Sequence, residues 1–80
     1  MRYRSLVLNT VAEIVRGPLG QAEAKRFIDR RSEDVKAADR ARFVEMVETE
    51  LLALHEGNIA PYKVLPTEFA AWRKAWARGA

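Results

Sequence analysis

The chain has 80 residues, of which 49% are hydrophobic and 31% charged, and this balance is typical of a folded globular domain rather than a disordered chain. A chain of this length forms a single domain with a small core. It contains no cysteine and one histidine, which excludes disulfides and thiolate metal sites and leaves few ligands for any other metal.

The formal net charge is +3, and the charges are unevenly distributed. Residues 1–31 carry seven basic and three acidic side chains, residues 32–58 carry three and seven, and residues 59–80 carry four and one. An acidic middle between two basic ends can steer a charged partner or bring oppositely charged surfaces of two copies together. The simpler interpretation is a set of solvated helix faces, because an exposed ion pair contributes only about 0 to 1 kcal/mol.

The first segment, MRYRSLVLNTVAEIV, has a basic tip, but its longest uninterrupted apolar run is LVL. Asn9, Thr10 and Glu13 interrupt the apolar character beyond that run. We therefore expect neither a signal peptide nor a membrane-spanning segment, and we expect a cytoplasmic protein.

Apolar residues of this segment recur at steps of three and four and predict a helix over residues 3–16. The residues on this face are Tyr3, Val7, Val11, Ile14 and Val15. The β-branched valines leave a short strand at RYRSLVL as an alternative, and Thr10 with Glu13 spells a capping box that would start the helix late. Gly17 in a left-handed conformation, followed by Pro18, is the predicted stop.

A second, shorter helix is predicted over residues 21–31. Its buried stripe is Ala24, Phe27 and Ile28. The basic side chains of the segment lie largely outside this stripe, so we expect them at the surface.

A third helix is predicted over residues 33–56, with a length of about 36 Å. Ser32 precedes it and offers an oxygen to the free amides of the first turn, where the negative charges of Glu33 and Asp34 are also favourable. The predicted stripe is Ala37, Ala41, Val44, Val47, Leu51 and Leu54, and the apolar residues that widen it are Phe43, Met46 and Leu52. This width exceeds what one antiparallel neighbour would cover, so several elements or a second copy should pack around the helix.

The stretch LHEGNIA at residues 54–60 holds the only histidine and a Gly-Asn pair. Gly57 and Asn58 both tolerate the positive φ that often ends a helix, and a protonated His55 would be favourably placed in the last turn. We interpret the stretch as a helix C-terminus rather than a catalytic or ligand site, and we predict a positive φ at Gly57.

Catalytic and metal-binding chemistry have little support in this sequence. The serines and threonines each have a capping or surface explanation, and His55 is the only candidate base. A cage made only of the carboxylates of Glu45, Glu48 and Glu56 would lack the spacing of known metal loops, and a solvated acidic face is the preferred interpretation. We therefore expect no enzyme activity, no catalytic residues, no cofactor and no metal.

The stretch IAPYKVLP contains two prolines, Pro61 and Pro66, which disfavour a helix between them. It is predicted to form an extended strap, with Tyr62 and Val64 on one side and Lys63 in solvent.

A last helix is predicted over residues 67–77, capped by Thr67 with Glu68 in its first turn. Phe69, Trp72 and Trp76 fall on one face of it. These rings can complete a small core, because aromatic side chains dominate the energetics of small cores. The alternative is an interface, since tryptophan, tyrosine and arginine concentrate binding energy.

Basic side chains in the first two predicted helices raise nucleic-acid binding as an alternative function. The residues are Arg2, Arg4, Lys25, Arg26, Arg30 and Arg31. The junction between the second and third helices lacks the glycine-containing turn of a helix-turn-helix, and glutamates on the third helix would repel phosphate.

The sequence as a whole predicts an all-α fold, a compact single-domain bundle of about four helices with an extended strap before the last one. The leading functional hypothesis is a non-enzymatic protein-interaction or regulatory module that docks to a protein partner or to itself as a homodimer. The residues expected to carry this interaction are Tyr62, Phe69, Trp72 and Trp76. Nucleic-acid binding is the alternative.

Overall fold

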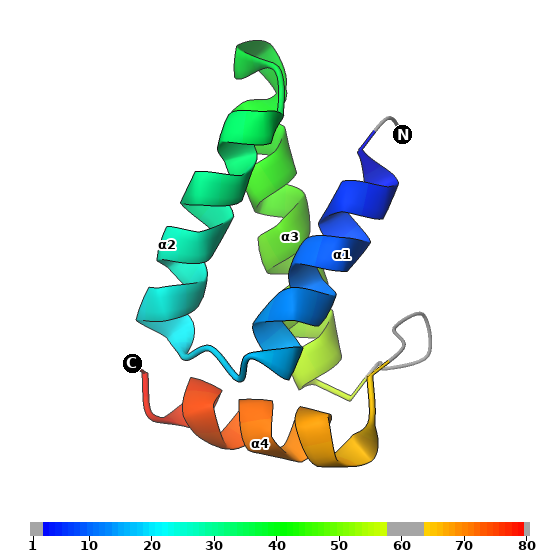
Figure 1. Cartoon of the computed structure of the whole chain (residues 1–80), viewed down its shortest axis with the longest axis vertical. Helices are drawn as coiled ribbons and strands as arrows, with labels where there is room; N and C mark the ends of the chain where they lie inside the picture. The colour runs from blue at the N-terminus through cyan, green and yellow to red at the C-terminus, as the bar shows by residue number, and fades with distance from the viewer. Residues whose placement is uncertain (1–2, 58–63, 80) are drawn as a thin grey trace.

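The structure is a computed structural model that describes residues 3–57 and 64–79 of the chain. Within these residues it contains four α-helices, two short 3-10 helices and no strand (Figure 1). The α-helices are α1 (Arg4–Arg16), α2 (Gln21–Arg31), α3 (Arg40–His55) and α4 (Pro66–Ala77), and the 3-10 helices η1 (Ser32–Asp34) and η2 (Ala37–Asp39) connect α2 to α3. The prediction of a single all-α domain is confirmed.

Helices α1, α2 and α3 extend along the long axis of the molecule, and α4 crosses one end of this group (Figure 1). α2 and α3 run antiparallel, joined at the far end by η1 and η2 (Figure 1). α1 contacts α2, α3 and α4, so it lies at the centre of the packing. No helix of the described residues is both long and apolar enough to cross a membrane.

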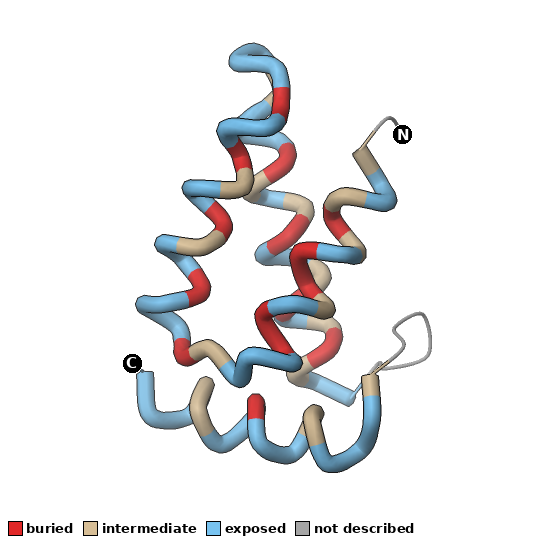
Figure 2. The backbone as a smooth tube through the Cα atoms, in the orientation of Figure 1, coloured by how far each residue is buried: buried red, intermediate tan, exposed pale blue. Residues whose placement is uncertain are grey.

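The core lies where the inner faces of the helices meet, and the buried residues of each helix face this interior (Figure 2). Its apolar members are Val7, Val11, Ile14, Val15, Ala24, Ile28, Val35, Phe43, Val47, Leu51, Leu54 and Trp72. Small and β-branched side chains from α1 pack against larger ones from α3 and α4, which is how a chain this short fills its interior.

Helix α1 forms because its apolar residues repeat with helical spacing, and it begins at Arg4. The strand alternative and the late start at Thr10 are therefore wrong. Thr10 is completely buried within the helix, and its Oγ1 donates a hydrogen bond to the carbonyl oxygen of Leu6 at 2.7 Å. This bond supplies the partner that a buried hydroxyl requires.

The end of α1 differs from the prediction at Gly17, whose φ of −81° is not left-handed. The helix is closed instead by amides that donate to its last carbonyls: Gly17 to Glu13 at 3.0 Å and Leu19 to Ile14 at 3.0 Å. Pro18 has no amide hydrogen and cannot extend the ladder. The helix therefore ends before Pro18 without a left-handed residue.

The predicted helix over residues 33–56 is wrong in its first part, because α3 begins at Arg40. The chain is extended at Val35 (φ −108°, ψ 146°) and Lys36 (φ −53°, ψ 139°). Val35 is buried in this conformation, whereas Ala37 and Ala41, which were expected in the stripe, are exposed. Burial of one valine therefore outweighs a helical turn that would bury only methyl groups.

Arg40 stabilises this break in the helix. Its Nε donates to the carbonyl oxygens of Ser32 at 3.2 Å and Val35 at 3.1 Å, and its Nη2 reaches that of Glu33 at 3.5 Å. Ser32 does not cap a helix as predicted, because its Oγ donates to the carbonyl oxygen of Asp29 at 2.6 Å. Ser32 thus bonds a carbonyl of the last turn of α2, and Arg40 bonds carbonyls of η1 and of Val35 just after it.

The C-terminus of α3 agrees with the prediction. Gly57 has a φ of 109°, and its amide donates to the carbonyl oxygen of Leu54 at 2.9 Å. His55 is the last residue of the helix. The prediction of a positive φ at Gly57 is confirmed, while Asn58 lies outside the described residues.

Helix α4 begins at Pro66, one residue before the predicted start. Leu65 is the residue before the first turn, and its amide donates to Oε1 of Glu68 at 2.9 Å. Thr67 therefore lies inside the first turn and does not cap the helix as predicted. Proline is well suited to that turn, since its missing amide hydrogen would have no partner there. Most of the predicted strap, including Tyr62, lies outside the described residues.

Candidate interaction groove between α2 and α3

The three aromatic residues of α4 share a face but have different surroundings. Trp72 is completely buried, and its ring lies between Phe69 and Trp76, with centroid distances of 6.1 and 5.2 Å. His55 contacts the same indole edge-on at 5.7 Å. Trp72 is thus a core residue that attaches α4 to the end of α3, and it has no surface to offer a partner. Phe69 and Trp76 are only partly buried.

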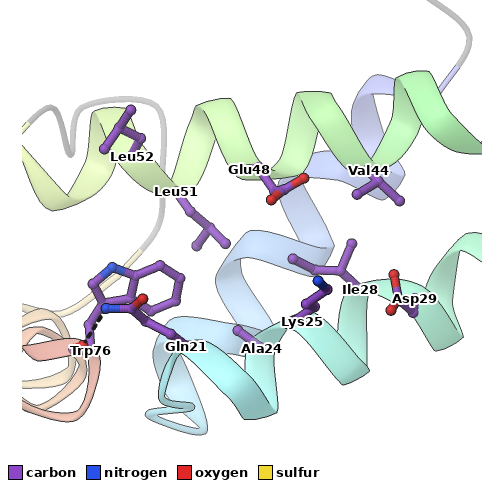
Figure 3. A pocket seen from close by; sticks show the side chains of 10 residues that line it. All are labelled: Gln21, Ala24, Lys25, Ile28, Asp29, Val44, Glu48, Leu51, Leu52 and Trp76. Atoms are coloured by element: carbon purple, nitrogen blue, oxygen red, sulfur yellow. Dashed lines mark hydrogen bonds between the residues drawn. The ribbon is translucent and has the colours of Figure 1, made fainter. Parts of the chain in front are cut away.

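Trp76 forms one end of a groove between α2 and α3 with a volume of about 490 Å³ (Figure 3). The residues that line the groove are Gln21, Ala24, Lys25, Ile28, Asp29, Val44, Glu48, Leu51, Leu52 and Trp76. Gln21 positions the tryptophan, because its Nε2 donates to the carbonyl oxygen of Trp76 at 2.9 Å and joins the first turn of α2 to the last turn of α4. This end of the groove is therefore built from three helices.

The interior of the groove is apolar. Ala24, Ile28 and Leu51 are buried core residues that form its floor, and the partly buried Val44 continues the apolar surface along α3. Leu52 stands at the edge with 60% of its surface exposed. Leu52 and the half-buried Trp76 both line the groove, so apolar side chains are accessible to solvent at this end of it.

The rim of the groove is charged. Lys25 and Asp29 from α2 and Glu48 from α3 lie around its opening (Figure 3). None of these three side chains forms an ion pair with another residue in the described part of the chain. An apolar centre with a charged edge is the usual anatomy of a protein-binding surface.

The basic residues of the nucleic-acid alternative have different surroundings. Arg31 forms an ion pair with Glu13 and lies over the ring of Phe27 at 5.0 Å. Arg4 is in the first turn of α1, and α1 and α2 diverge toward that end (Figure 1). Arg2 lies outside the described residues. The remaining basic residues, all exposed on α2, are Lys25, Arg26 and Arg30.

His55 is partly buried at the end of α3, where its ring packs on Trp72. No group of three or more residues capable of holding a metal ion occurs in the described ranges 3–57 and 64–79. The position of His55 agrees with its interpretation as a helix-end residue.

Of the four residues proposed from the sequence for protein interaction, Trp76 lines the groove, Trp72 lies in the core and Tyr62 lies outside the described residues. Phe69 is partly buried on the same helix, where the guanidinium of Arg73 lies over its ring at 5.5 Å. The groove residues that were not proposed as site residues include Gln21, Glu48 and Leu52. Leu52 could have been found, because it widens the apolar face of its helix beyond the buried stripe.

Comparison of the chain with protein-family models, with curated proteins and with solved structures gives no match in any of the three. Because one fold hosts many functions, the chemistry of the groove is the basis for assigning a function to this chain.

Proposed function

We propose that the chain is a non-enzymatic protein-interaction module and that the groove between α2 and α3 is its docking surface. The observation that carries this proposal is the apolar groove of about 490 Å³, with Leu52 exposed at its edge and charged side chains on its rim. Ligand sites for small molecules place polar groups inside the cavity to orient the ligand. Here the floor is formed by Ala24, Ile28 and Leu51, and the charged groups lie only at the edge.

The shape of the groove suits a helix of another protein chain. The groove follows α2, whose 11 residues correspond to a length of about 16 Å. A partner helix of about three turns could lie along it, with apolar residues at steps of three and four on the floor. Trp76 supports this proposal because a half-buried tryptophan at the end of a groove is a typical anchor of binding energy.

Photo-crosslinking tests the proposal. A benzophenone amino acid at Leu52 would contact a docked partner directly, and the same residue at Arg42, which is exposed on α3 but does not line the groove, is the matched control. We expect covalent adducts from position 52 in cells and few or none from position 42. Equal yields at the two positions, or no adduct at position 52, would overturn the proposal.

Nucleic-acid binding remains the second candidate, supported by three basic side chains exposed on α2, namely Lys25, Arg26 and Arg30. Phosphate contacts depend strongly on salt, whereas apolar docking does not. Anisotropy titrations of labelled DNA and RNA at two salt concentrations therefore separate the two functions. Tight binding that weakens steeply with salt and is lost in an Arg26→Ala/Arg30→Ala variant would favour this second candidate.

A further inference from the structure

The exposed charges of α4 differ from those of the other helices. Each of α1, α2 and α3 exposes both acidic and basic side chains. Among the four α-helices of the described residues, α4 alone exposes charges of one sign, Arg73 and Lys74, and the exposed Arg78 follows directly after its last residue. The acidic residue of α4, Glu68, is partly buried, and its Oε1 accepts a hydrogen bond from the amide of Leu65. This helix therefore presents three cations to solvent without an exposed acidic side chain of its own.

The cations lie on the part of α4 that faces away from the core. Trp72 is completely buried on the inner side, where α4 crosses the end of the other three helices (Figure 1). Helical spacing puts Lys74 and Arg78 on the opposite side, about 6 Å apart along the axis, with Arg73 at its edge. The other exposed residues of the helix are small or compact: Pro66, Thr67, Ala70, Ala71 and Ala77. A ligand can therefore approach the outer side of α4 closely.

The ends of the other helices flank this surface. The end of α3 adjoins α4 through the contact of His55 with Trp72, and the first turn of α2 adjoins it through the hydrogen bond from Gln21 to Trp76. The charged residues exposed at these helix ends carry one positive and two negative charges: Arg16, Glu23 and Glu56. Since they lie on the side of α4 that holds the other helices, the outer side keeps its excess of positive charge.

We propose that this outer surface of α4, made of Arg73, Lys74 and Arg78, binds the phosphate backbone of nucleic acid. Nucleic acid carries a phosphate charge at every nucleotide, so cations spaced along one helix can contact several successive charges. Arginine and lysine side chains are among the usual partners of backbone phosphates. The inference goes beyond the proposed function and does not rest on it, because the groove between α2 and α3 is a different surface.

A membrane surface is another polyanion, and the composition of α4 argues against it. Helices that lie in a membrane interface present large apolar residues to the lipid beside their basic ones. The large apolar residues of α4 are Phe69, Trp72 and Trp76, and they pack against or within the core on the opposite face. Leu65 is 62% exposed but is a single apolar side chain that precedes the helix. Nucleic acid therefore fits this surface better than lipid.

Salt-dependent binding of a short fluorescein-labelled DNA duplex, measured by anisotropy, tests the proposal. Three phosphate contacts predict a slope of about −2.7 for the logarithm of the association constant against the logarithm of salt concentration. Binding should then weaken about 40-fold between about 50 and about 200 mM salt. The double variant Lys74→Gln/Arg78→Gln should bind at least about tenfold more weakly at the lower salt, and the magnitude of its slope should fall by about 1.8.

The matched control is Arg26→Gln/Arg30→Gln, which also removes two exposed cations, but from α2. The loss of net charge is the same in both double variants, so a difference between them reports local contacts. We expect the control to change the affinity less than about threefold and to keep the wild-type slope. Circular dichroism checks that α4 is intact. Arg78→Gln alone changes a residue just beyond the helix and should reduce the magnitude of the slope by about 0.9.

Three results would overturn the inference: no binding of the duplex by the wild type at the lower salt, a loss in the α2 control as large as that in the α4 variant, or tighter binding to vesicles of phosphatidylcholine and phosphatidylserine than to the duplex. The proposed function is tested separately by photo-crosslinking. A chain that binds the duplex through α4 and gives no adduct from position 52 would refute the docking groove and leave this inference intact.

Discussion

Trp72 and Trp76 are four residues apart on α4, yet burial gives them different roles. Trp72 is completely enclosed by the core, where it contacts rings on α3 and α4, whereas Trp76 is half-buried and lines the groove. Helical spacing places the two side chains on one face but does not determine how deeply each is buried. Depth depends on the position of α4 across the end of the other helices, which only the three-dimensional structure reveals.

Replacement of Trp72 should therefore destabilise the fold more than replacement of Trp76. Trp72→Ala should lower the free energy of unfolding by about 3 to 5 kcal/mol, because it leaves a large cavity in a small core. Trp76→Ala should cost about 1 to 2 kcal/mol, because part of the ring is already in solvent. Urea unfolding followed by circular dichroism measures both values.

Photo-crosslinking from position 52 provides a second measurement that distinguishes the two tryptophans. Trp76→Ala should keep its helical spectrum and lose most of the photo-crosslinking from position 52, since the ring forms the end of the groove. If Trp76→Ala were the more destabilising of the two substitutions, the assignment of Trp72 to the core and Trp76 to the groove would be refuted.

At the scale of elements, residues 32–39 show how a strongly charged segment can mislead prediction. Ser32 followed by Glu33 and Asp34 is a typical helix start, but the serine bonds backward to the end of α2 and the chain then becomes extended at Val35. The extended conformation depends on two tertiary features: Val35 is buried in the core, and the Arg40 side chain donates a hydrogen bond to the carbonyl oxygen of Val35. Neither is a local preference of the sequence.

The ends of α1 and α3 were easier to predict from the sequence, for a different reason in each helix. Proline ends α1 by chemistry that acts locally, and glycine ends α3 by its tolerance of positive φ. The groove was not predictable in this way. Its walls come from three helices, and Gln21 and Trp76 are joined by a hydrogen bond across 55 positions of sequence. Periodicity within one helix contains no signal for such a contact.

Arg40 is predicted to stabilise the turn between α2 and α3 through its guanidinium group. Arg40→Ala should lower the free energy of unfolding by about 1 to 2 kcal/mol, because several carbonyls lose a charged donor. Arg40→Lys should recover only part of this loss, since an ammonium group lacks the planar fork that reaches Ser32 and Val35 together.

Arg42 provides the control for this prediction. It is exposed on the same helix, and Arg42→Ala should change the unfolding free energy by less than about 0.5 kcal/mol. Both substitutions replace an arginine of α3 with alanine and remove one positive charge. A difference between their unfolding free energies therefore reports the contacts that each arginine side chain makes. Equal effects at positions 40 and 42 would contradict the role assigned to Arg40.

At the scale of the whole molecule, the described helices share one core, and α4 is attached to it mainly by one fully buried side chain. Within α4, which the structure describes in full, Trp72 is the only buried residue, while α1 and α3 supply most of the apolar interior. Such an attachment can act in two ways. Either α4 is part of the cooperative unit, or it separates from the other helices before they unfold.

We expect a single cooperative transition, because α4 closes the end of the core and its loss would expose buried residues of α1, which it contacts. Fluorescence of the two tryptophans reports α4, and circular dichroism at 222 nm reports all helices, so the two urea curves should coincide. In Trp72→Phe the remaining Trp76 reports the groove end alone, and its curve should coincide with circular dichroism of the same variant. A fluorescence transition at lower urea than the loss of helix, in the wild type and in this variant, would instead identify α4 as a separate unit, and the groove would then be closed or opened by movement of that helix.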